Sequence, residues 1–278
     1  YLMLQKRIAQ VSSWLDALDS SFDNRVHGSV LTLRTITGRM AHAKPNMAQV
    51  PAGYSPYGKE CRTCWTVPKG KVLVGIDASG IELRMLAHYM RDPKYVEELL
   101  NGDIHTLNQT NAGLETRDQA KTFIYAFLYG AGSKKIGSIV GSGSKKGKEL
   151  IDNFLEQTPS LALLRNRVTQ EAGRSWLRGL DNRKIWVRSA HSALNTKLQG
   201  AAAVVMKKAL VLFANGLDKD VKIVANVHDE WQVECDASQG NLVGKLGVDA
   251  IIDAGKYYKL NCPLDGEYKL GNNWSETH

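Results

Sequence analysis

The chain has 278 residues, of which 43% are hydrophobic and 23% are charged, a composition typical of a globular protein with a large core in one or two domains. Its formal net charge of +8 favours a polyanionic partner, either nucleic acid or a membrane surface. No stretch approaches the roughly 18 consecutive apolar residues of a membrane-spanning helix, so we expect none. The first residues have neither a signal-peptide profile nor an initiator methionine, and we interpret the sequence as a fragment or a processed product.

The first third of the chain has a mixed pattern of helices and strands. Apolar residues at helical spacing predict a helix over residues 1–19, and alternation predicts a strand over 26–35. The polar stretch 37–56, marked by Gly and Pro, predicts an irregular loop. A nearly continuous apolar run over 72–76 is typical of a central buried strand. The helices that we expect next span residues 80–90, 95–100 and 103–113.

The rest of the chain has its strongest helical pattern over residues 116–129, with Thr116 as a suitable N-cap. The basic Gly/Ser stretch 141–148 is short enough to be a loop. Two strands, 221–227 and 231–235, are expected to flank a turn that carries Asp229. The other expected elements are helices at 148–155, 160–171, 194–215 and 242–254, a hairpin over 173–188 and a short strand near 257–260. This order predicts an α+β fold, with acids on an antiparallel sheet and cations on helices.

The four cysteines do not form the pattern of a structural metal site. Cys61 and Cys64 form a Cys-x-x-Cys pair, whereas Cys235 and Cys262 stand alone. A zinc site needs a second close pair of ligands. We therefore expect four reduced thiols, as in a cytosolic protein.

Two aspartates interrupt apolar, strand-like segments that are far apart in the sequence. Asp77 ends the run Val-Gly-Ile-Asp, and Asp229 lies in Val-His-Asp-Glu. A carboxylate at the end of a buried strand is costly unless a cation lies against it. The alternative is a pair of turn aspartates that bond only to the backbone, and it applies more to Asp229. Together the two residues favour ligands shared by two divalent cations.

A cationic stripe lies on the helix predicted between these aspartates. Arg117, Lys121 and Tyr125 are four residues apart and share one face, and Tyr129 lies at its edge. The alternative is a solvated basic face, but such a face normally carries acidic partners at i±4, which are missing here. Cations followed by aromatic rings suit a nucleoside triphosphate, because the cations meet the phosphates and a ring meets the base.

Arg39 and Gln199 are long hydrogen-bond donors in otherwise uncharged surroundings. The alternative is that each is an ordinary surface residue. Donors of this kind are also what a protein needs to contact the minor-groove acceptors of DNA, since adenine N3 and thymine O2 look alike there.

Three segments together resemble motifs A, B and C of the family-A (DNA polymerase I family) polymerases. They are residues 77–84, 117–130 and 227–230, and they occur in the family's order. Residues 37–39 and 46–51 match the segment that precedes motif A. The tail 271–278 is similar to the end of the bacteriophage replicative branch. The resemblance therefore extends over essentially the whole chain.

The resemblance implies a role for particular residues of this sequence. Asp77, Ala78 and Asp229 would hold two Mg²⁺ ions, and Glu230 adjoins them. Lys121 would also protonate the pyrophosphate leaving group. The residues implied to contact the incoming deoxynucleoside triphosphate (dNTP) are His105, Arg117, Lys121, Tyr125, Glu82 and Tyr129, with Glu82 packed against Tyr129 as the barrier to a ribose 2′-OH. Those implied to lie along the primer–template minor groove are Arg39, Gln199 and His228.

The resemblance also implies a right-hand polymerase with an antiparallel-sheet palm, helical fingers and only the end of a thumb. The implied division is 1–35 for the end of the thumb, 36–103 for the first part of the palm, 104–190 for the fingers and 191–278 for the second part of the palm. The partners would be primer–template DNA and dNTP, without a membrane, and a processivity factor would bind through a thumb that this chain lacks. The compartment would be the cytoplasm, that of a bacterial host if the protein is viral.

The expected activity is template-directed addition of dNTPs to a primer 3′-OH with release of pyrophosphate. Three alternatives stay open. A single-subunit RNA polymerase shares the metal chemistry but would lack a glutamate at position 82. A catalytically weak DNA-binding remnant would have no need of both aspartates, Arg117 and Lys121. A metal-dependent nuclease would not need a cationic helix for triphosphate.

Overall fold

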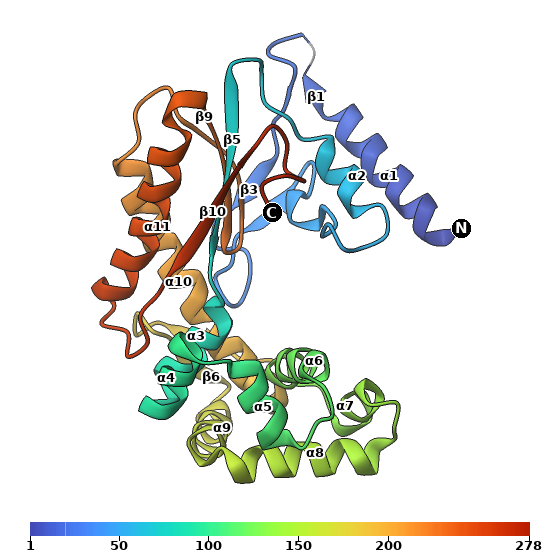
Figure 1. Ribbon diagram of the computed structural model, residues 1–278, viewed down its shortest axis with the longest axis vertical. Helices are drawn as coiled ribbons and strands as arrows, with labels where there is room; N and C mark the ends of the chain where they lie inside the picture. The colour runs from blue at the N-terminus through green and yellow to red at the C-terminus, as the bar shows by residue number, and fades with distance from the viewer. Residues whose placement is uncertain (20) are drawn as a thin grey trace. The chain divides into compact units, whose positions relative to one another are not determined.

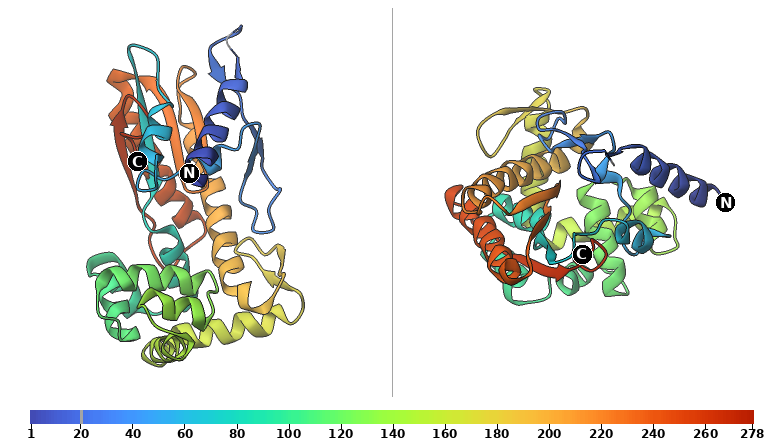
Figure 2. Two further views of the ribbon diagram at one scale, coloured as in Figure 1. Left: turned by 90° about the vertical axis from the view of Figure 1, so that its right-hand side faces the viewer. Right: turned by 90° about the horizontal axis from the view of Figure 1, so that it is seen from above.

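The computed structural model describes residues 1–19 and 21–278, which form two compact units. Unit 1 comprises Tyr1–Ser79, Ala203–Tyr258 and Leu264–His278, and unit 2 comprises Gly80–Ala202 and Lys259–Pro263. Figures 1 and 2 show that unit 1 combines a sheet with helices and that unit 2 is mostly helical. The predicted α+β class is confirmed.

Unit 1 is built on a four-stranded antiparallel sheet with the order β10-β5-β9-β8. The strands are β5 (Lys71–Ala78), β8 (Lys222–Val227), β9 (Glu230–Asp236) and β10 (Gly266–Gly271). β5 is the predicted central strand, and its side chains Val74 and Ile76 have no exposed surface. An apolar run of this kind forms a strand that is covered on both faces.

Helices cover both faces of this sheet (Figures 1 and 2). On one face, α11 (Gly240–Tyr257) packs on β5 and β10, and Phe213 stacks on Trp231 of β9 with ring centroids 5.1 Å apart. On the other, α1 (Leu2–Asp16), α2 (Gly58–Thr63) and the tail 271–278 share a buried cluster: Trp14, Val50, Cys61, Leu73 and Trp274. The tail is therefore part of the core of unit 1.

The segment between α1 and α2 is more regular than predicted. The strand expected over 26–35 is wrong as a single element, and the loop expected over 37–56 contains ordered pieces. The elements present are β1 (Leu18–Asp19), β2 (Arg25–Val26), β3 (Ser29–Leu31), β4 (Ala41–Ala43) and the 3₁₀ turn η1 (Met47–Gln49). β3 pairs with β4, whose Ala-His-Ala sequence has little strand preference, so the pairing is set by tertiary contact.

Unit 2 packs its helices around aromatic side chains. Phe154 meets the rings of Phe123 and Phe127 edge-on, with centroids 5.2 and 5.4 Å away. Its helices are α3 (Ile81–Met90), α4 (Pro93–Asn101), α5 (Ile104–Ala112), α6 (Arg117–Leu128), α7 (Ser133–Ile139), α8 (Ser144–Gln157) and α9 (Pro159–Ala172), followed by the hairpin β6 (Trp176–Arg178) and β7 (Lys184–Trp186), and by the start of α10 (Ala193–Asn215). The helix predicted over 116–129 is confirmed as α6, with the capping box of Thr116 and Gln119 at its start.

Two predictions in the second half of the chain are wrong. The loop expected over 141–148 is shorter, because α8 begins at Ser144 and α7 precedes it. Gly147 fits there because a Cβ at this position would lie 1.9 Å from the carbonyl oxygen of Ser133, so packing between the two helices overrides low helix propensity. The strand expected near 257–260 is instead the last residue of α11 followed by a turn, and the edge strand β10 comes later.

By length and composition alone, the helical stretch Ala190–Asn215 could cross a membrane. However, 56% of its apolar window is buried inside the protein, as in the core helix of many soluble proteins. It is therefore weak evidence for a membrane span.

Candidate functional site

The register of the sheet brings the two predicted aspartates to the same end of unit 1. Asp77, near the end of β5, lies directly opposite Glu230 on β9. Asp229 occupies the two-residue turn between β8 and β9, and its carbonyl oxygen accepts a hydrogen bond from the amide of Ala78 at 3.1 Å. Asp77, Ala78 and Asp229 therefore meet, although they come from distant parts of the sequence.

The electrostatics of this cluster favour a bound cation. Burial, together with the negative charges of Asp229 and Glu230, raises the pKa of Asp77 to about 7. A cation between the carboxylates would stabilise their ionised forms. Among residues 1–19 and 21–278, no group of three or more His, Cys, Asp or Glu side chains forms a metal cage. Asp77 and Asp229 therefore offer carboxylate oxygens, the donor atoms that hard divalent cations prefer.

Glu230, the neighbour of Asp229, is held by hydrogen bonds. It is 6% exposed, and its Oε1 atom accepts from the side chain of Gln232 at 2.6 Å and from the indole N–H of Trp274. Its Oε2 atom lies 3.1 Å from Nδ1 of His278. Burial acts to raise the pKa of Glu230, but the contacts with His278 and Trp274 and the nearby Arg62 lower it overall.

The tail 271–278 reaches Glu230 by lying directly on β5. Thr277 donates to the side-chain oxygen of Gln232 at 2.7 Å. A Cβ on Gly75 would lie 2.2 Å from the carbonyl oxygen of Thr277, so only glycine permits this approach. The tail therefore lies two residues from Asp77 along the strand.

His228 and Arg39, both predicted to contact DNA, influence each other electrostatically. Burial, together with the positive charges of Arg39 and His42, lowers the pKa of His228 to about 4. His228 is therefore neutral at physiological pH. Within the described part of the chain, Nδ1 of His228 and Nε2 of His42 are buried without a hydrogen-bond partner. Gln199, the third residue of this group, lies half-buried on α10 in unit 2.

In unit 2, the predicted triphosphate residues gather on α5 and α6. Arg117 and Lys121 are exposed, and the ring of Tyr125 lies 6.4 Å from that of His105. Burial lowers the pKa of His105, and the positive charge of Arg117 acts in the same direction. The four side chains therefore form one positively charged surface with two rings.

Arg117 has an acidic partner that helical spacing did not reveal. Its Nε and Nη2 atoms donate to the carboxylate of Asp103 at 2.6 and 3.1 Å. This contact holds the pKa of Asp103 well below its usual range. Asp103 is also the N-cap of α5, where it accepts from the amides of His105 and Thr106.

Glu82 and Tyr129 are joined as the sequence suggested. The hydroxyl of Tyr129 donates to both carboxylate oxygens of Glu82, at 2.9 and 3.1 Å. Glu82 lies in the first turn of α3, and Tyr129 caps the end of α6. The bond fixes the tyrosine ring beside the cationic face of α6.

Sequence reasoning missed residues that contact the predicted ones. They are Arg62, Gln232, Trp274, Thr277 and His278 around Glu230, His42 beside His228, and Asp103 beside Arg117. Except for Gln232, each of these residues lies in a different segment of the sequence from the residue that it contacts. Local spacing therefore could not predict these contacts.

Comparison with known proteins places this arrangement in a family. The family model for "DNA polymerase family A" matches residues 1–276. The chain belongs to DNA polymerase family A. It is 44% identical to proteins named "DNA-directed DNA polymerase" from Enterobacteria phage T3 and from Escherichia phage T7, over the whole of this chain and 45% of each relative. The chain thus spans less than half of the length of these family-A relatives.

A solved structure has the same family-A fold. It is described as "POL domain of Pol1 from M. smegmatis complex with DNA primer-template and dNTP", and it matches with a TM-score of 0.85 over 97% of this chain and 51% of that chain. The sequence identity is 22%. The likeness shows that the chain has the right-hand polymerase fold.

Proposed function

We propose that this family-A chain performs template-directed DNA synthesis, adding dNTPs to a primer 3′-OH and releasing pyrophosphate. The observation that carries the proposal is the meeting of Asp77 and Asp229 at one end of the sheet, where burial and mutual repulsion raise the pKa of Asp77 to about 7. The relatives named DNA-directed DNA polymerase support the same activity.

Asp77, Asp229 and Ala78 are the residues that would hold two Mg²⁺ ions. When bound, such ions favour ionisation of the attacking hydroxyl and offset the charge of the phosphates. The protein's own contribution is positional, because strand register and the bond from Ala78 to the Asp229 carbonyl fix both carboxylates before the substrate arrives.

Arg117, Lys121 and His105 bind the triphosphate, and Tyr125 contacts its sugar. Lys121 also donates a proton to the pyrophosphate as it leaves, a role that suits an exposed ammonium. The pairing of Arg117 with Asp103 is near the surface and therefore exchangeable for a phosphate.

Glu82 and Tyr129 select deoxyribose. The bond from the tyrosine hydroxyl holds the Glu82 carboxylate in place, where it would crowd the position of a ribose 2′-OH. This pair distinguishes DNA synthesis from the alternative of RNA synthesis.

Primer–template DNA is the second partner. Arg39, Gln199 and His228 donate to minor-groove acceptors that every correct base pair presents, so they respond to pairing geometry instead of sequence. We assign residues 36–103 and 191–278 to the palm, 104–190 to the fingers and 1–35 to the end of the thumb. The site of action is the host cytoplasm, as for a phage polymerase.

Primer extension tests the proposal directly. The chain is incubated with primer–template DNA and with dNTPs, NTPs or dNTPs plus a chelator. Extension only with dNTPs and free Mg²⁺ is expected. Extension with NTPs would favour an RNA polymerase, shortening of the primer would favour a nuclease, and binding without extension would favour a DNA-binding remnant.

A further inference from the structure

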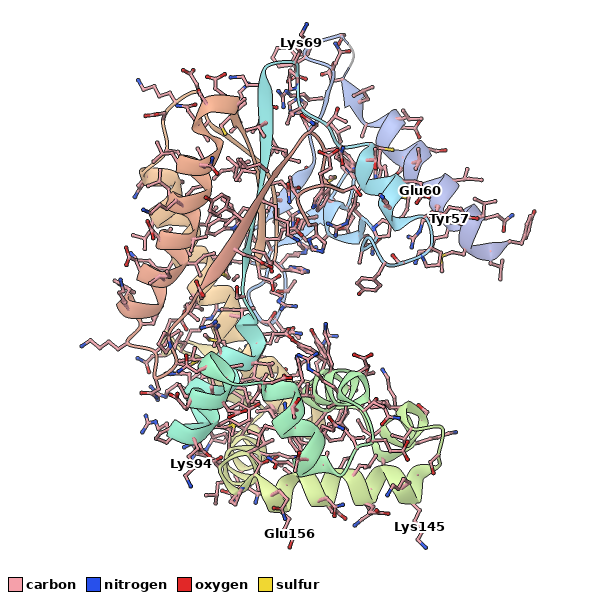
Figure 3. The ribbon with its side chains drawn as sticks, viewed as in Figure 1. Tyr57, Glu60, Lys69, Lys94, Lys145 and Glu156 are labelled. Carbon is pink, nitrogen blue, oxygen red and sulfur yellow. The ribbon has the colours of Figure 1, made fainter. Side chains whose placement is uncertain are left out.

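Arg62 is a buried cation close to the carboxylates of unit 1. It is 6% exposed, and its Nη1 atom lies 3.8 Å from Oε1 of Glu230. Glu60, two residues earlier on α2, instead points outward (Figure 3). A lone arginine on the inward face of a helix is costly unless its charge is paired and its donors are used.

Several contacts fix this guanidinium, although its Nη1 atom has no hydrogen-bond partner among the described residues. Its Nε atom donates to the carbonyl oxygen of Pro51 at 2.9 Å. Its Cζ atom lies over the ring of Trp274, 4.7 Å from the ring centroid. Anchored from different sides, the side chain offers Glu230 a positive charge at a fixed place.

Trp274 completes the arrangement. Its indole N–H donates to Glu230, its ring is 2% exposed, and its amide donates to the carbonyl oxygen of Trp65 at 3.0 Å. Arg62, Trp274 and Glu230 therefore form a buried triangle, which we call the Glu230 anchor. Trp65 follows α2 in sequence, so the same segment that carries Arg62 also holds Trp274.

The Glu230 anchor acts on Asp229 through the main chain. The two residues are adjacent, and the carbonyl oxygen of Asp229 is already bonded to Ala78. Because Glu230, the next residue, is also held, the backbone of Asp229 is fixed by Ala78 and by the Glu230 anchor. The positive charge of Arg62 also offsets the negative charge of Glu230. The negative charges of Asp77 and Asp229 then remain available to bind cations.

Resting on the proposed polymerase function, we propose that Arg62 is a positioning residue of the nucleotidyl-transfer site, because it fixes Glu230 and thereby the carboxylate of Asp229. Arg62 does not touch the substrate in this proposal. Its loss should lower kcat and leave dNTP KM and primer–template affinity unchanged.

Arg25 provides a matched control. Its Nη2 atom lies 2.8 and 2.9 Å from the carboxylate oxygens of Glu234, a buried glutamate on the same strand β9 as Glu230. Arg25→Met breaks a comparable pair four residues farther from Asp229. Arg25 has no role in the proposed site, so its variant reports the cost of breaking a partly buried ion pair by itself.

The experiment compares Arg62→Met, Arg62→Lys and Arg25→Met in the full 278-residue chain. Each variant is tested well below its own unfolding temperature. We expect Arg62→Met to lower kcat by about 10- to 100-fold, the range for supporting partners of metal ligands. Arg62→Lys keeps the charge and should recover part of this loss, and Arg25→Met should keep the wild-type kcat. Equal kcat in Arg62→Met and wild type, or an equal loss in Arg25→Met, would overturn the proposal.

Calorimetric titration with Mn²⁺ separates this proposal from the proposed function. If the wild-type chain does not extend a primer, the proposed function fails, and Mn²⁺ binding then decides the role of Arg62. Arg62→Lys should weaken Mn²⁺ binding about tenfold, whereas the matched Arg25→Lys should not change it. Unchanged binding in Arg62→Lys would show that Arg62 does not position the carboxylates.

Discussion

The candidate residues of unit 1 are fixed by the main chain, whereas those of unit 2 are fixed by exposed side chains. Asp77 and Glu230 are cross-strand neighbours, and the backbone of Asp229 bonds to that of Ala78. In unit 2, the Arg117–Asp103 pair has side chains 52% and 42% exposed. A half-buried, backbone-held site keeps its geometry without a ligand, whereas an exposed pair exchanges partners at little cost. The two units therefore suit fixed chemistry and adaptable substrate binding.

The largest effect should come from the backbone-held site. Replacing Asp229 by Asn keeps the side-chain shape but removes the charge that a cation needs. We expect kcat to fall by at least about 1,000-fold, since metal stabilisation of the reaction amounts to several kcal/mol. Asp77→Asn should lower kcat by a similar factor, and both variants should keep a primer–template affinity near that of the wild type. Rapid primer-extension kinetics and DNA-binding titration measure the two quantities.

Asp236→Asn is the control for this prediction. Asp236 ends the same strand β9 and pairs at the surface with Lys71 at 2.9 Å. Its replacement should leave kcat unchanged. If Asp229→Asn extended primers at nearly the wild-type rate, the half-buried carboxylates of Asp77 and Asp229 would not be the catalytic centre, and the contrast between the two units would lose its basis.

The exposed face of α6 should give the next largest effect. Lys121→Ala removes both a phosphate contact and the proton donor to the leaving group, so we expect kcat to fall by about 100-fold. Lys145 is a matched control, because it lies at the tip of α8 and points into solvent (Figure 3). Lys145→Ala should not change kcat. Equal effects of the two substitutions would mean that the α6 face is only a solvated basic surface.

The contrast between the units also explains which features were predictable. Helix α6 and the residues Arg117, Lys121 and Tyr125 follow from spacing along one helix, which is local information. Neither segment alone determines the strand register that brings Asp77 and Asp229 together. Their meeting was therefore expected only from the chemistry of the two residues and from the family resemblance. The Glu230 anchor was missed, since Arg62 and Trp274 come together only through tertiary packing. Asp103 was missed for the same reason, because its partner Arg117 lies on the following helix.

The Glu82–Tyr129 pair should give a moderate effect on selectivity. Glu82→Ala removes the barrier to a 2′-OH, so ribonucleotide incorporation relative to deoxyribonucleotide should rise by about 10- to 100-fold. Tyr129→Phe keeps the ring and removes only the hydroxyl that holds Glu82. It should raise ribonucleotide use less than Glu82→Ala does. Competition between a dNTP and the matching NTP gives the ratio, and an unchanged ratio in Glu82→Ala would remove this residue from sugar selection.

The smallest effect concerns the exchange of partners by Arg117. Asp103 competes with a phosphate for this guanidinium, so Asp103→Asn should lower dNTP KM by about twofold while kcat stays the same. Asparagine caps a helix as well as aspartate does, so the start of α5 should remain intact.

Asp92→Asn is the matched control: Asp92 caps α4 in the same way, but its carboxylate accepts from the hydroxyl of Ser160 at 2.8 Å instead of from an arginine. Steady-state kinetics at low salt, where surface ion pairs are least screened, should show the difference most clearly. A rise in KM for Asp103→Asn would instead mean that the carboxylate orients Arg117 for the phosphate, and unit 2 would then hold its site as firmly as unit 1 does.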